Sequence, residues 1–184
     1  MLFLIDKSII EIIPFKACRL SSRNSQIDAI FYQASAIQSF ASASARKAFH
    51  WLWLGRYLNE EPEHSFLAVT QQHGVVGYLA GSLADPAQRQ AFNDLPYVKD
   101  FAHMTAHYPA HFHINVAKDL RSAGIGARLV EAFTSHAHST GTSGIHIVTG
   151  RDMRNVGFYT RNGFEIRAST SNGSRELVLL VRQL

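Results

Sequence analysis

The chain has a single cysteine, few charged residues and no long apolar run. Cys18 has no second cysteine to pair with, which excludes an internal disulfide framework and a structural zinc site built from cysteine pairs. Charged residues make up 17% of the 184, below the roughly 25% usual in globular chains. No stretch reaches the about 18 apolar residues of a membrane helix. The sequence therefore predicts a soluble, cytoplasmic protein that does not enter a membrane.

The amino terminus and the charge balance exclude two further classes. The apolar start MLFLIDKSIIEII is interrupted by Asp6, Lys7 and Glu11, so it lacks the unbroken core of a signal peptide. The net charge is +4 and no basic stripe is visible, so no nucleic-acid partner is expected. With 46% hydrophobic residues and no internal repeat, residues 1–184 are expected to form one domain around one core.

Hydrophobic spacing in the first half predicts strands that meet in a hairpin and helices with one apolar face. Ser25 is a plausible helix N-cap, because Ile27, Ile30 and Phe31 follow at helical spacing. The expected elements are a strand at 9–15, helices at 25–34 and 45–58, and paired strands at 66–70 and 75–83. A less regular insertion at 85–110 contains three prolines and several aromatic residues, and it is expected to be a packed excursion that faces the substrate.

In the second half, strands and helices alternate. A strand at 111–116 leads through a glycine loop into a helix ending near Gly141, and a strand at 145–149 leads into a short helix closed by Gly163. The chain then ends in a hairpin of strands at 165–168 and 176–181 around a turn at 171–174. Strands that both alternate with helices and meet in hairpins predict an α/β fold with a mixed sheet and helices on both faces.

The glycine loop follows the strand that ends at Val116. Amides in the first turn of a helix have no helical acceptor and lie at the positive end of the helix dipole. Gly124 and Gly126 would let a diphosphate approach these amides; alternatively, they only allow close packing of helix and sheet. The run lacks the Gly-Lys-Ser/Thr of a Walker loop, and Leu129 stands where the dinucleotide pattern requires glycine.

Two motifs resemble those of the GNAT N-acetyltransferase superfamily. Val116, Arg121, Gly124 and Gly126 are similar to its V-x-x-x-x-[RQ]-x-x-G-x-[GA] signature, and the residues from Phe158 to Phe164 are similar to its F-Y-x-x-x-G-F motif. The resemblance is firm over residues 111–165. The segment YPAHFHIN is also similar to the acetyltransferase-like domain attached to some O-GlcNAc hydrolases.

This resemblance implies a three-layer fold in which two parallel strands, ending at Val116 and spanning 145–149, splay apart to admit acetyl-CoA. The diphosphate of acetyl-CoA would lie on the loop amides. The family often has asparagine seven residues before the motif tyrosine and alanine four before it, where this chain has Asp152 and Asn155. The residues implied in cofactor binding are Val116, Arg121, Ser122, Ala123, Gly124, Ile125, Gly126, Ala127, Asn155 and Tyr159.

Two side chains are candidates for the chemistry of acetyl transfer to an amine. Tyr159 matches the family's acid for the departing thiolate; otherwise it packs in the core. In the strand HFHINV, period two places His111, His113 and Asn115 on one face, which lines the acceptor site or meets solvent. His113 is the candidate general base, because histidine titrates near neutral pH; the alternative is a structural or exposed histidine.

The function expected is N-acetyl transfer from acetyl-CoA to a primary amine of a small molecule or a protein, by direct transfer in a ternary complex. The alternative is a CoA-binding pseudo-acetyltransferase with a regulatory role, since the strand of His113 has no glutamate. A metal-dependent hydrolase built on His103, His107, His111 and His113 is a weaker alternative, since Pro109 interrupts the run. No bound metal is expected, and a homodimer is left open.

Overall fold

The computed structural model describes residues 10–172 and 175–184. In these residues seven strands form one sheet in the order β1-β2-β3-β4-β5-β7-β6. The pairs β1–β2, β2–β3, β5–β7 and β6–β7 are antiparallel, whereas β4–β5 is parallel. The predicted mixed sheet is therefore confirmed. The strands are β1 (Glu11–Pro14), β2 (Phe66–Thr70), β3 (Gly74–Ser82), β4 (Ala110–Val116), β5 (Gly144–Gly150), β6 (Glu165–Asn172) and β7 (Arg175–Gln183).

The described residues divide into two compact units. Unit 1 runs up to Ala80 and continues with His113–Phe133, and unit 2 comprises Gly81–Phe112 and Thr134–Leu184. The expectation of one domain stays a prediction. The α-helices are α1 (Arg23–Ala34), α2 (Ala43–His50), α3 (Arg56–Glu60), α4 (Val98–Thr105), α5 (Ile125–Ser139) and α6 (Asn155–Arg161).

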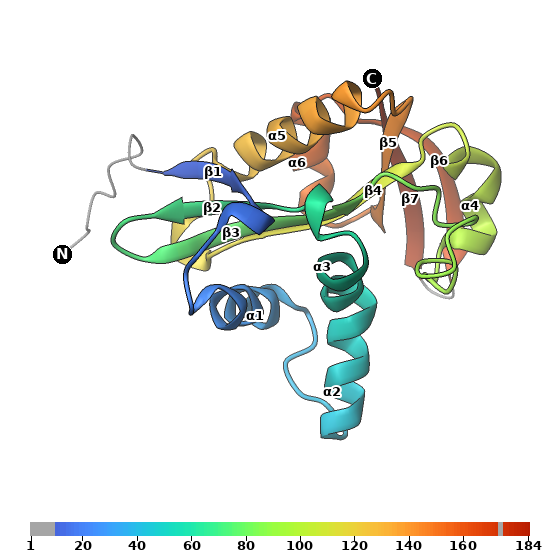
Figure 1. The fold of residues 1–184 in the computed structure, drawn as a ribbon. Helices are drawn as coiled ribbons and strands as arrows, with labels where there is room; N and C mark the ends of the chain where they lie inside the picture. Colours follow the sequence, from blue (N-terminus) through green and yellow to red (C-terminus); the bar gives the residue numbers. More distant parts are fainter. Residues whose placement is uncertain (1–9, 173–174) are drawn as a thin grey trace. The chain divides into compact units, whose positions relative to one another are not determined.

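In unit 1, helices cover both faces of the hairpin β2–β3. Figure 1 shows α1, α2 and α3 on one side of these strands and the first part of α5 on the other. Gly77 lets β3 approach β4, because a Cβ there would lie 3.3 Å from the Asn115 carbonyl oxygen. Apolar side chains from both helical layers close the core against the strands. Its fully buried members include Ile27, Phe31, Leu67, Tyr78, Leu79, Ile125 and Leu129.

Helix α1 starts earlier than the sequence pattern predicts. Its N-cap position is Ser22, and the Ser25 hydroxyl donates to the Ser22 carbonyl at 2.9 Å from within the first turn. The prediction of Ser25 as N-cap is therefore wrong, because this serine bonds backward along the helix instead of capping it. The apolar face is confirmed, since Ile27, Ile30 and Phe31 are buried.

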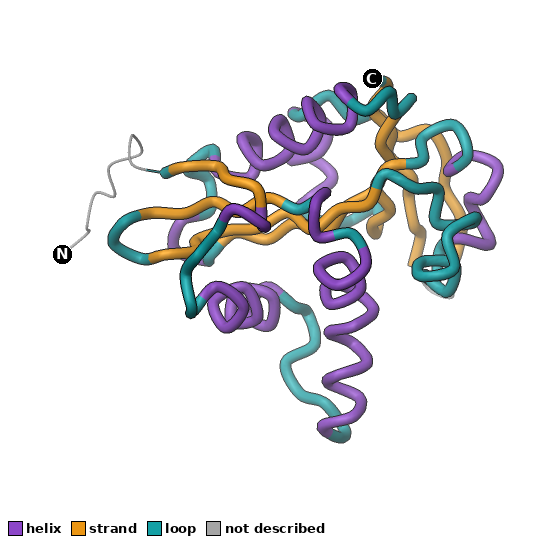
Figure 2. The backbone as a smooth tube through the Cα atoms, in the orientation of Figure 1, coloured by secondary structure: helices purple, strands orange, loops and turns teal. Residues whose placement is uncertain are grey.

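The second predicted helix is interrupted by a π-helical segment. Helix α2 starts at Ala43, where the Ser42 side chain accepts a hydrogen bond from the Ala45 amide at 3.1 Å. The π segment, η3 (Trp51–Gly55), connects α2 to α3, and Figure 2 shows the three as one helical run. The spacing of apolar residues does not reveal the wider turns of a π-helix. Such π segments frequently occur at functional sites.

Unit 2 corrects the expectation for the insertion at 85–110. Helix α4 forms there because Val98, Phe101 and Thr105 are spaced three and four residues apart and are all buried. The prolines flank this helix and do not interrupt it. Phe92 and Tyr97 are buried too, so the predicted packed excursion is confirmed.

The remaining predicted elements of the second half are confirmed with small changes. Helix α5 ends before Gly141, which has φ +78°, and α6 ends before Gly163, which has φ +82°. Both glycines adopt the left-handed conformation that closes a helix. Strands β6 and β7 extend beyond the predicted ranges, and the middle of the predicted turn, residues 173–174, lies outside the described residues. Ile9 also lies outside them, and β1 starts at Glu11.

Candidate active site

In unit 1, the loop from β4 to α5 adopts a conformation that requires glycine. Ser122 has φ +65° and Gly124 has φ +82°, so two residues of the loop are left-handed. A Cβ at Gly124 would meet no atom within 4 Å. Gly124 is therefore required for its backbone angle and not for close packing of helix and sheet. This excludes the packing alternative at this glycine.

This loop leaves a series of backbone donors without acceptors. Within the described part of the chain, no acceptor is recorded for the N–H groups of Ser122 to Ala127, and the first helical bond of α5 runs from the Arg128 amide to the Gly124 carbonyl at 3.2 Å. The Arg121 amide is outside this set, because it donates to the Lys118 carbonyl at 3.4 Å. Consecutive unbonded N–H groups at the start of a helix form a binding site for an anion such as a diphosphate.

Side chains fix the position of the loop. The Arg121 Nε donates to the Val116 carbonyl at 3.2 Å, so the structure brings these two predicted residues together. The short 3-10 turn η5 (Lys118–Leu120) is tied to α1, since the Lys118 amide donates to the Gln33 side chain at 3.3 Å. Gln33 was not anticipated, because it lies 85 residues before Lys118. The arginine thus braces the end of the strand as well as adding positive charge.

Tyr159 lies on α6 in unit 2, and its ring is buried. Phe158, Phe164 and Phe112 surround it at centroid distances of 5.2, 5.8 and 6.2 Å. Burial raises the pKa of the hydroxyl, so the group keeps its proton at neutral pH. None of the described residues is recorded as a hydrogen-bond partner of this hydroxyl. Packing thus accounts for the ring and leaves the O–H available as a donor.

Asn155 is the first residue of α6. Its Oδ1 accepts a hydrogen bond from the Thr149 hydroxyl at 3.0 Å, which fixes the amide relative to β5. Because the oxygen accepts, the Nδ2 group is left to donate. No acceptor for that nitrogen is recorded within residues 10–172 and 175–184. Asp152, which also departs from the family pattern, is exposed.

His113, on β4 in unit 1, lies in a hydrogen-bonded aromatic cluster. Its Nδ1 is 3.3 Å from the Tyr78 hydroxyl, and the Asn115 Nδ2 donates to the same hydroxyl at 2.8 Å. The rings of Phe31 and Trp53 lie 5.9 and 6.4 Å from the imidazole. This burial lowers the pKa of His113 to about 4, so the ring is neutral at pH 7. The sequence pattern missed Tyr78, because it lies in an apolar strand without a motif.

The third polar residue of the predicted face, His111, is only 2% exposed and belongs to unit 2. Its ring lies 5.3 Å from that of His146, and Phe92 contacts it edge-on at 5.1 Å. His111 therefore does not meet solvent. In the part of the chain that the structure describes, no group of three or more His, Cys, Asp or Glu side chains is arranged to hold a metal ion.

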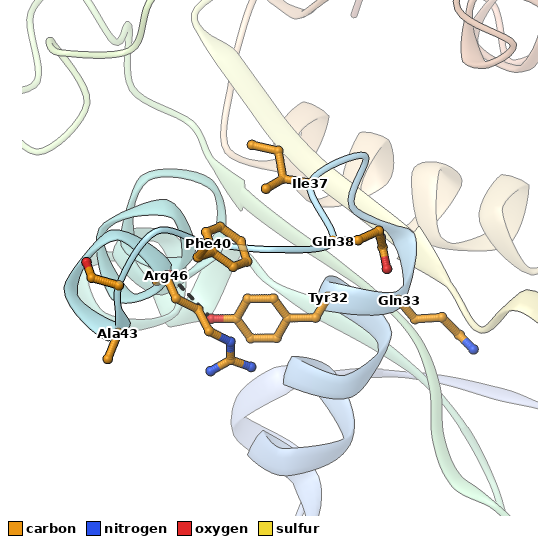
Figure 3. A pocket seen from close by; sticks show the side chains of 8 residues that line it. Tyr32, Gln33, Ile37, Gln38, Phe40, Ala43 and Arg46 are labelled. Carbon is orange, nitrogen blue, oxygen red and sulfur yellow. Dashed lines mark hydrogen bonds between the residues drawn. The ribbon is translucent and has the colours of Figure 1, made fainter.

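A pocket of about 530 Å³ opens in unit 1 where α1 connects to α2. Figure 3 shows Tyr32 extending from α1 toward Phe40 and Arg46. The Arg46 guanidinium lies 3.6 Å from the Tyr32 ring centroid, a cation–π contact. Gln33, which holds η5, also lines this pocket. The lining residues are Tyr32, Gln33, Ile37, Gln38, Phe40, Ser42, Ala43 and Arg46.

Comparison with known proteins assigns this fold to the acetyltransferases. The profile of the family described as "Acetyltransferase (GNAT) domain" matches residues 62–166, more than half of the chain. The chain belongs to the GNAT acetyltransferase family. None of the curated protein sequences matches it. Within the described residues, no helix has both the length and the apolar character needed to cross a membrane.

Solved structures share this fold at low sequence identity. SsHAT is 21% identical with a TM-score of 0.71, over 95% of this chain and 98% of that protein. A GCN5-related N-acetyltransferase from Kribbella flavida is 15% identical with a TM-score of 0.65, over 97% and 100%. One chain of the NatC complex bound to Gag peptide and CoA is 16% identical with a TM-score of 0.59, over 95% of this chain and 98% of that chain. The kinship to domains attached to O-GlcNAc hydrolases stays a prediction.

Proposed function

We propose that this protein transfers an acetyl group from acetyl-CoA to a primary amine, directly within a ternary complex. The observation that carries the proposal is the run of backbone N–H groups from Ser122 to Ala127 that have no acceptor in the described chain. Family membership supports the same reaction class. The amine belongs to a small molecule or to a protein side chain or terminus.

The residues of the loop fit the diphosphate of acetyl-CoA. Amides 122–127 supply donors, the left-handed Gly124 aims them, and Arg121 adds positive charge while it braces Val116. We assign Asn155 to the pantetheine arm, because its Nδ2 is left to donate. Bound acetyl-CoA would supply the activated thioester. Among proteins with this fold, the NatC structure contains CoA.

Two side chains are assigned to proton chemistry. Tyr159 would donate its hydroxyl proton to the departing thiolate, and burial, which raises its pKa, keeps the group protonated at neutral pH. His113 would meet the acceptor amine. A general base works best with a pKa near the working pH, and the pKa of His113 is about 4, so His113 would remove the amine proton only weakly.

The pocket between α1 and α2 is the candidate site for the acceptor. It combines the aromatic rings of Tyr32 and Phe40 with the cation of Arg46. Figure 3 shows that these three side chains come from α1, from the connecting loop and from α2. We propose that the acceptor enters here.

Calorimetric titration with acetyl-CoA tests the proposal. We expect roughly micromolar binding that is lost in the double variant Arg121→Glu, Gly124→Asp, because both changes place negative charge at the diphosphate site. The control Lys99→Glu alters an exposed cation on α4 and should bind normally. Absence of binding by a folded wild-type sample would overturn the cofactor assignment.

Turnover separates the enzyme from the pseudoenzyme. We expect acetylation of at least one amine in a panel, and we expect Tyr159→Phe to lower kcat about a hundredfold without weakening acetyl-CoA binding. The control Tyr108→Phe removes a tyrosine hydroxyl elsewhere in unit 2 and should leave kcat unchanged. Binding without turnover of any amine would favour the regulatory CoA-binding module.

A further inference from the structure

A directional hydrogen-bond chain links three side chains of unit 1. The Asn115 amide donates to the Tyr78 hydroxyl oxygen at 2.8 Å, and that oxygen lies 3.3 Å from the Nδ1 of His113. Tyr78 is on β3, whereas Asn115 and His113 are on β4. The two members on β4 are two residues apart, so they share a face of the strand. The hydrogen bonds therefore run from Asn115 on β4 to Tyr78 on β3 and back to His113 on β4.

The need of the buried Tyr78 O–H for an acceptor selects the tautomer of the imidazole. The Tyr78 oxygen accepts from Asn115, and among the described residues His113 Nδ1 is the recorded partner that can accept the hydroxyl proton. That nitrogen then accepts, and in a neutral imidazole the proton lies on the other nitrogen, Nε2. The reverse arrangement would leave the buried Tyr78 O–H without an acceptor among the described residues, which is unfavourable.

The surroundings keep this imidazole neutral. Phe31 from α1, Trp53 from η3 and Tyr78 from β3 pack around the ring at 5.9, 6.4 and 6.2 Å. Asp28, on the same turn of α1 as Phe31, is already paired with His50, since its Oδ1 lies 2.8 Å from the His50 Nε2. Burial also lowers the pKa of His113 to about 4. Among the described residues, no acidic side chain is recorded as a partner of this ring, and burial is the cause of its lowered pKa.

The Nε2 atom remains unused. His113 is half-buried, and over the residues that the structure covers no partner for Nε2 is recorded. Nε2 is also not among the polar atoms that are both fully buried and unpartnered. The hydrogen-bond chain thus ends in an N–H group available to a ligand.

We propose that His113 uses Nε2–H as a fixed hydrogen-bond donor to the acceptor substrate, and that Tyr78 and Asn115 are the positioning residues that set this tautomer. The inference rests on the proposed acetyltransferase function. An N–H donor bound to the attacking nitrogen would block its lone pair, so the partner is an oxygen atom elsewhere in the substrate. The substrate class is therefore a primary amine with a nearby carbonyl or hydroxyl oxygen. This role differs from that of the general base indicated by the strand pattern.

Long-range proton–nitrogen NMR spectra test the tautomer without any substrate. We expect the His113 ring, assigned by loss of its signals in His113→Gln, to carry its proton on Nε2 at pH 7. Tyr78→Phe should shift this ring toward a mixture of tautomers. The matched control Tyr97→Phe, a tyrosine next to His146, should leave the His113 signals in place. A proton on Nδ1 in the wild-type protein would overturn the proposal.

Kinetics test the donor role with two substitutions of His113. Glutamine can place an amide N–H near the position of Nε2, whereas asparagine can do so only near Nδ1. For an oxygen-bearing amine we expect His113→Gln to keep KM within about threefold and His113→Asn to raise it about tenfold, the effect of one hydrogen bond. Equal and large losses of kcat in both variants would instead assign His113 as a base and overturn the donor role.

Paired amines test the substrate class, for example glycinamide against propylamine and ethanolamine against ethylamine. We expect the oxygen-bearing member of each pair to have the higher kcat/KM in the wild-type protein and to lose this advantage in His113→Asn. An equal advantage in that variant would overturn the assignment. If acetyl-CoA binds but no amine is acetylated, the proposed function fails and the donor role fails with it, while the NMR result still shows whether the hydrogen-bond chain is as described.

Discussion

Two histidines, one in each unit, have the same protonation state and different bonding. His113 on β4 and His146 on β5 both have a pKa lowered by burial to about 4, and each lies beside a tyrosine hydroxyl. His146 uses both nitrogens: Nδ1 donates to the Tyr108 carbonyl at 2.5 Å, so Nε2 accepts from the Tyr97 hydroxyl at 3.4 Å. In the described part of the chain, His113 has a recorded hydrogen bond only at Nδ1.

This difference distinguishes a structural histidine from one that can act on a ligand. A carbonyl oxygen can only accept, so it places the proton of His146 on Nδ1. The buried Tyr78 hydroxyl, which accepts from Asn115, uses Nδ1 of His113 as its own acceptor and so leaves the proton of that ring on Nε2. Both rings are neutral and enclosed by aromatic side chains. Only His113 keeps a hydrogen-bonding atom that the described protein does not use, and burial or pKa alone would not reveal this.

Replacing each histidine by alanine should give the largest difference in stability between the two sites. We expect His146→Ala to lower the free energy of unfolding by about 4 kcal/mol, because it leaves a cavity and an unbonded Tyr108 carbonyl. His113→Ala, at a half-buried site, should cost about 2 kcal/mol. Urea unfolding at pH 7.5 measures both, with the exposed His138→Ala as a control that changes little. Equal losses at the two sites would remove the structural distinction.

Acid should destabilise the protein through both rings. Each has a folded-state pKa of about 4, below its usual 6.5, so the unfolded chain binds protons that the folded chain does not. The stability is therefore fully present above pH 6.5 and is lost as the pH falls toward 4, by on the order of 3 kcal/mol for His146.

Urea unfolding between pH 7.5 and 5 measures how steeply the free energy of unfolding falls with pH. This range lies above the pH values at which most carboxylates titrate. His146→Gln and His113→Gln should each flatten this slope by up to about 1.4 kcal/mol per pH unit. A slope unchanged by either substitution would show that the rings titrate normally in the folded protein.

Removing the tyrosine hydroxyls should have the smallest effect on stability and the sharpest contrast in function. Tyr97→Phe and Tyr78→Phe each delete one hydrogen bond to a histidine, so each should cost about 1 kcal/mol of unfolding free energy. Only Tyr78→Phe should raise KM for the acceptor amine. A rise in KM for Tyr97→Phe of the same size would mean that general loosening, and not the tautomer of His113, sets substrate binding.

The sequence was least informative where packing decides the local structure. Ser25 has the residue type of an N-cap, yet α1 starts earlier and Ser25 bonds back to Ser22. Three prolines indicated an irregular insertion, yet α4 forms there because Phe101 and its neighbours bury one face. Helix α4 depends on burial against residues outside it, which local patterns do not contain. The start of α1 is a local case, in which a hydrogen bond to the Ser22 carbonyl replaces capping by Ser25.

The sequence by itself determined the strand, glycine loop and helix around Gly124, because the amide directions there follow from the angles of a few consecutive residues. It also determined the mixed sheet, since strands that alternate with helices pair in parallel and strands joined by short turns pair antiparallel. Only the tertiary structure decided the partner of His113, because Tyr78 lies 35 residues away and meets it through strand pairing. The neutral state and the tautomer of that ring follow from this enclosure, so they depend on the fold and not on spacing in the sequence.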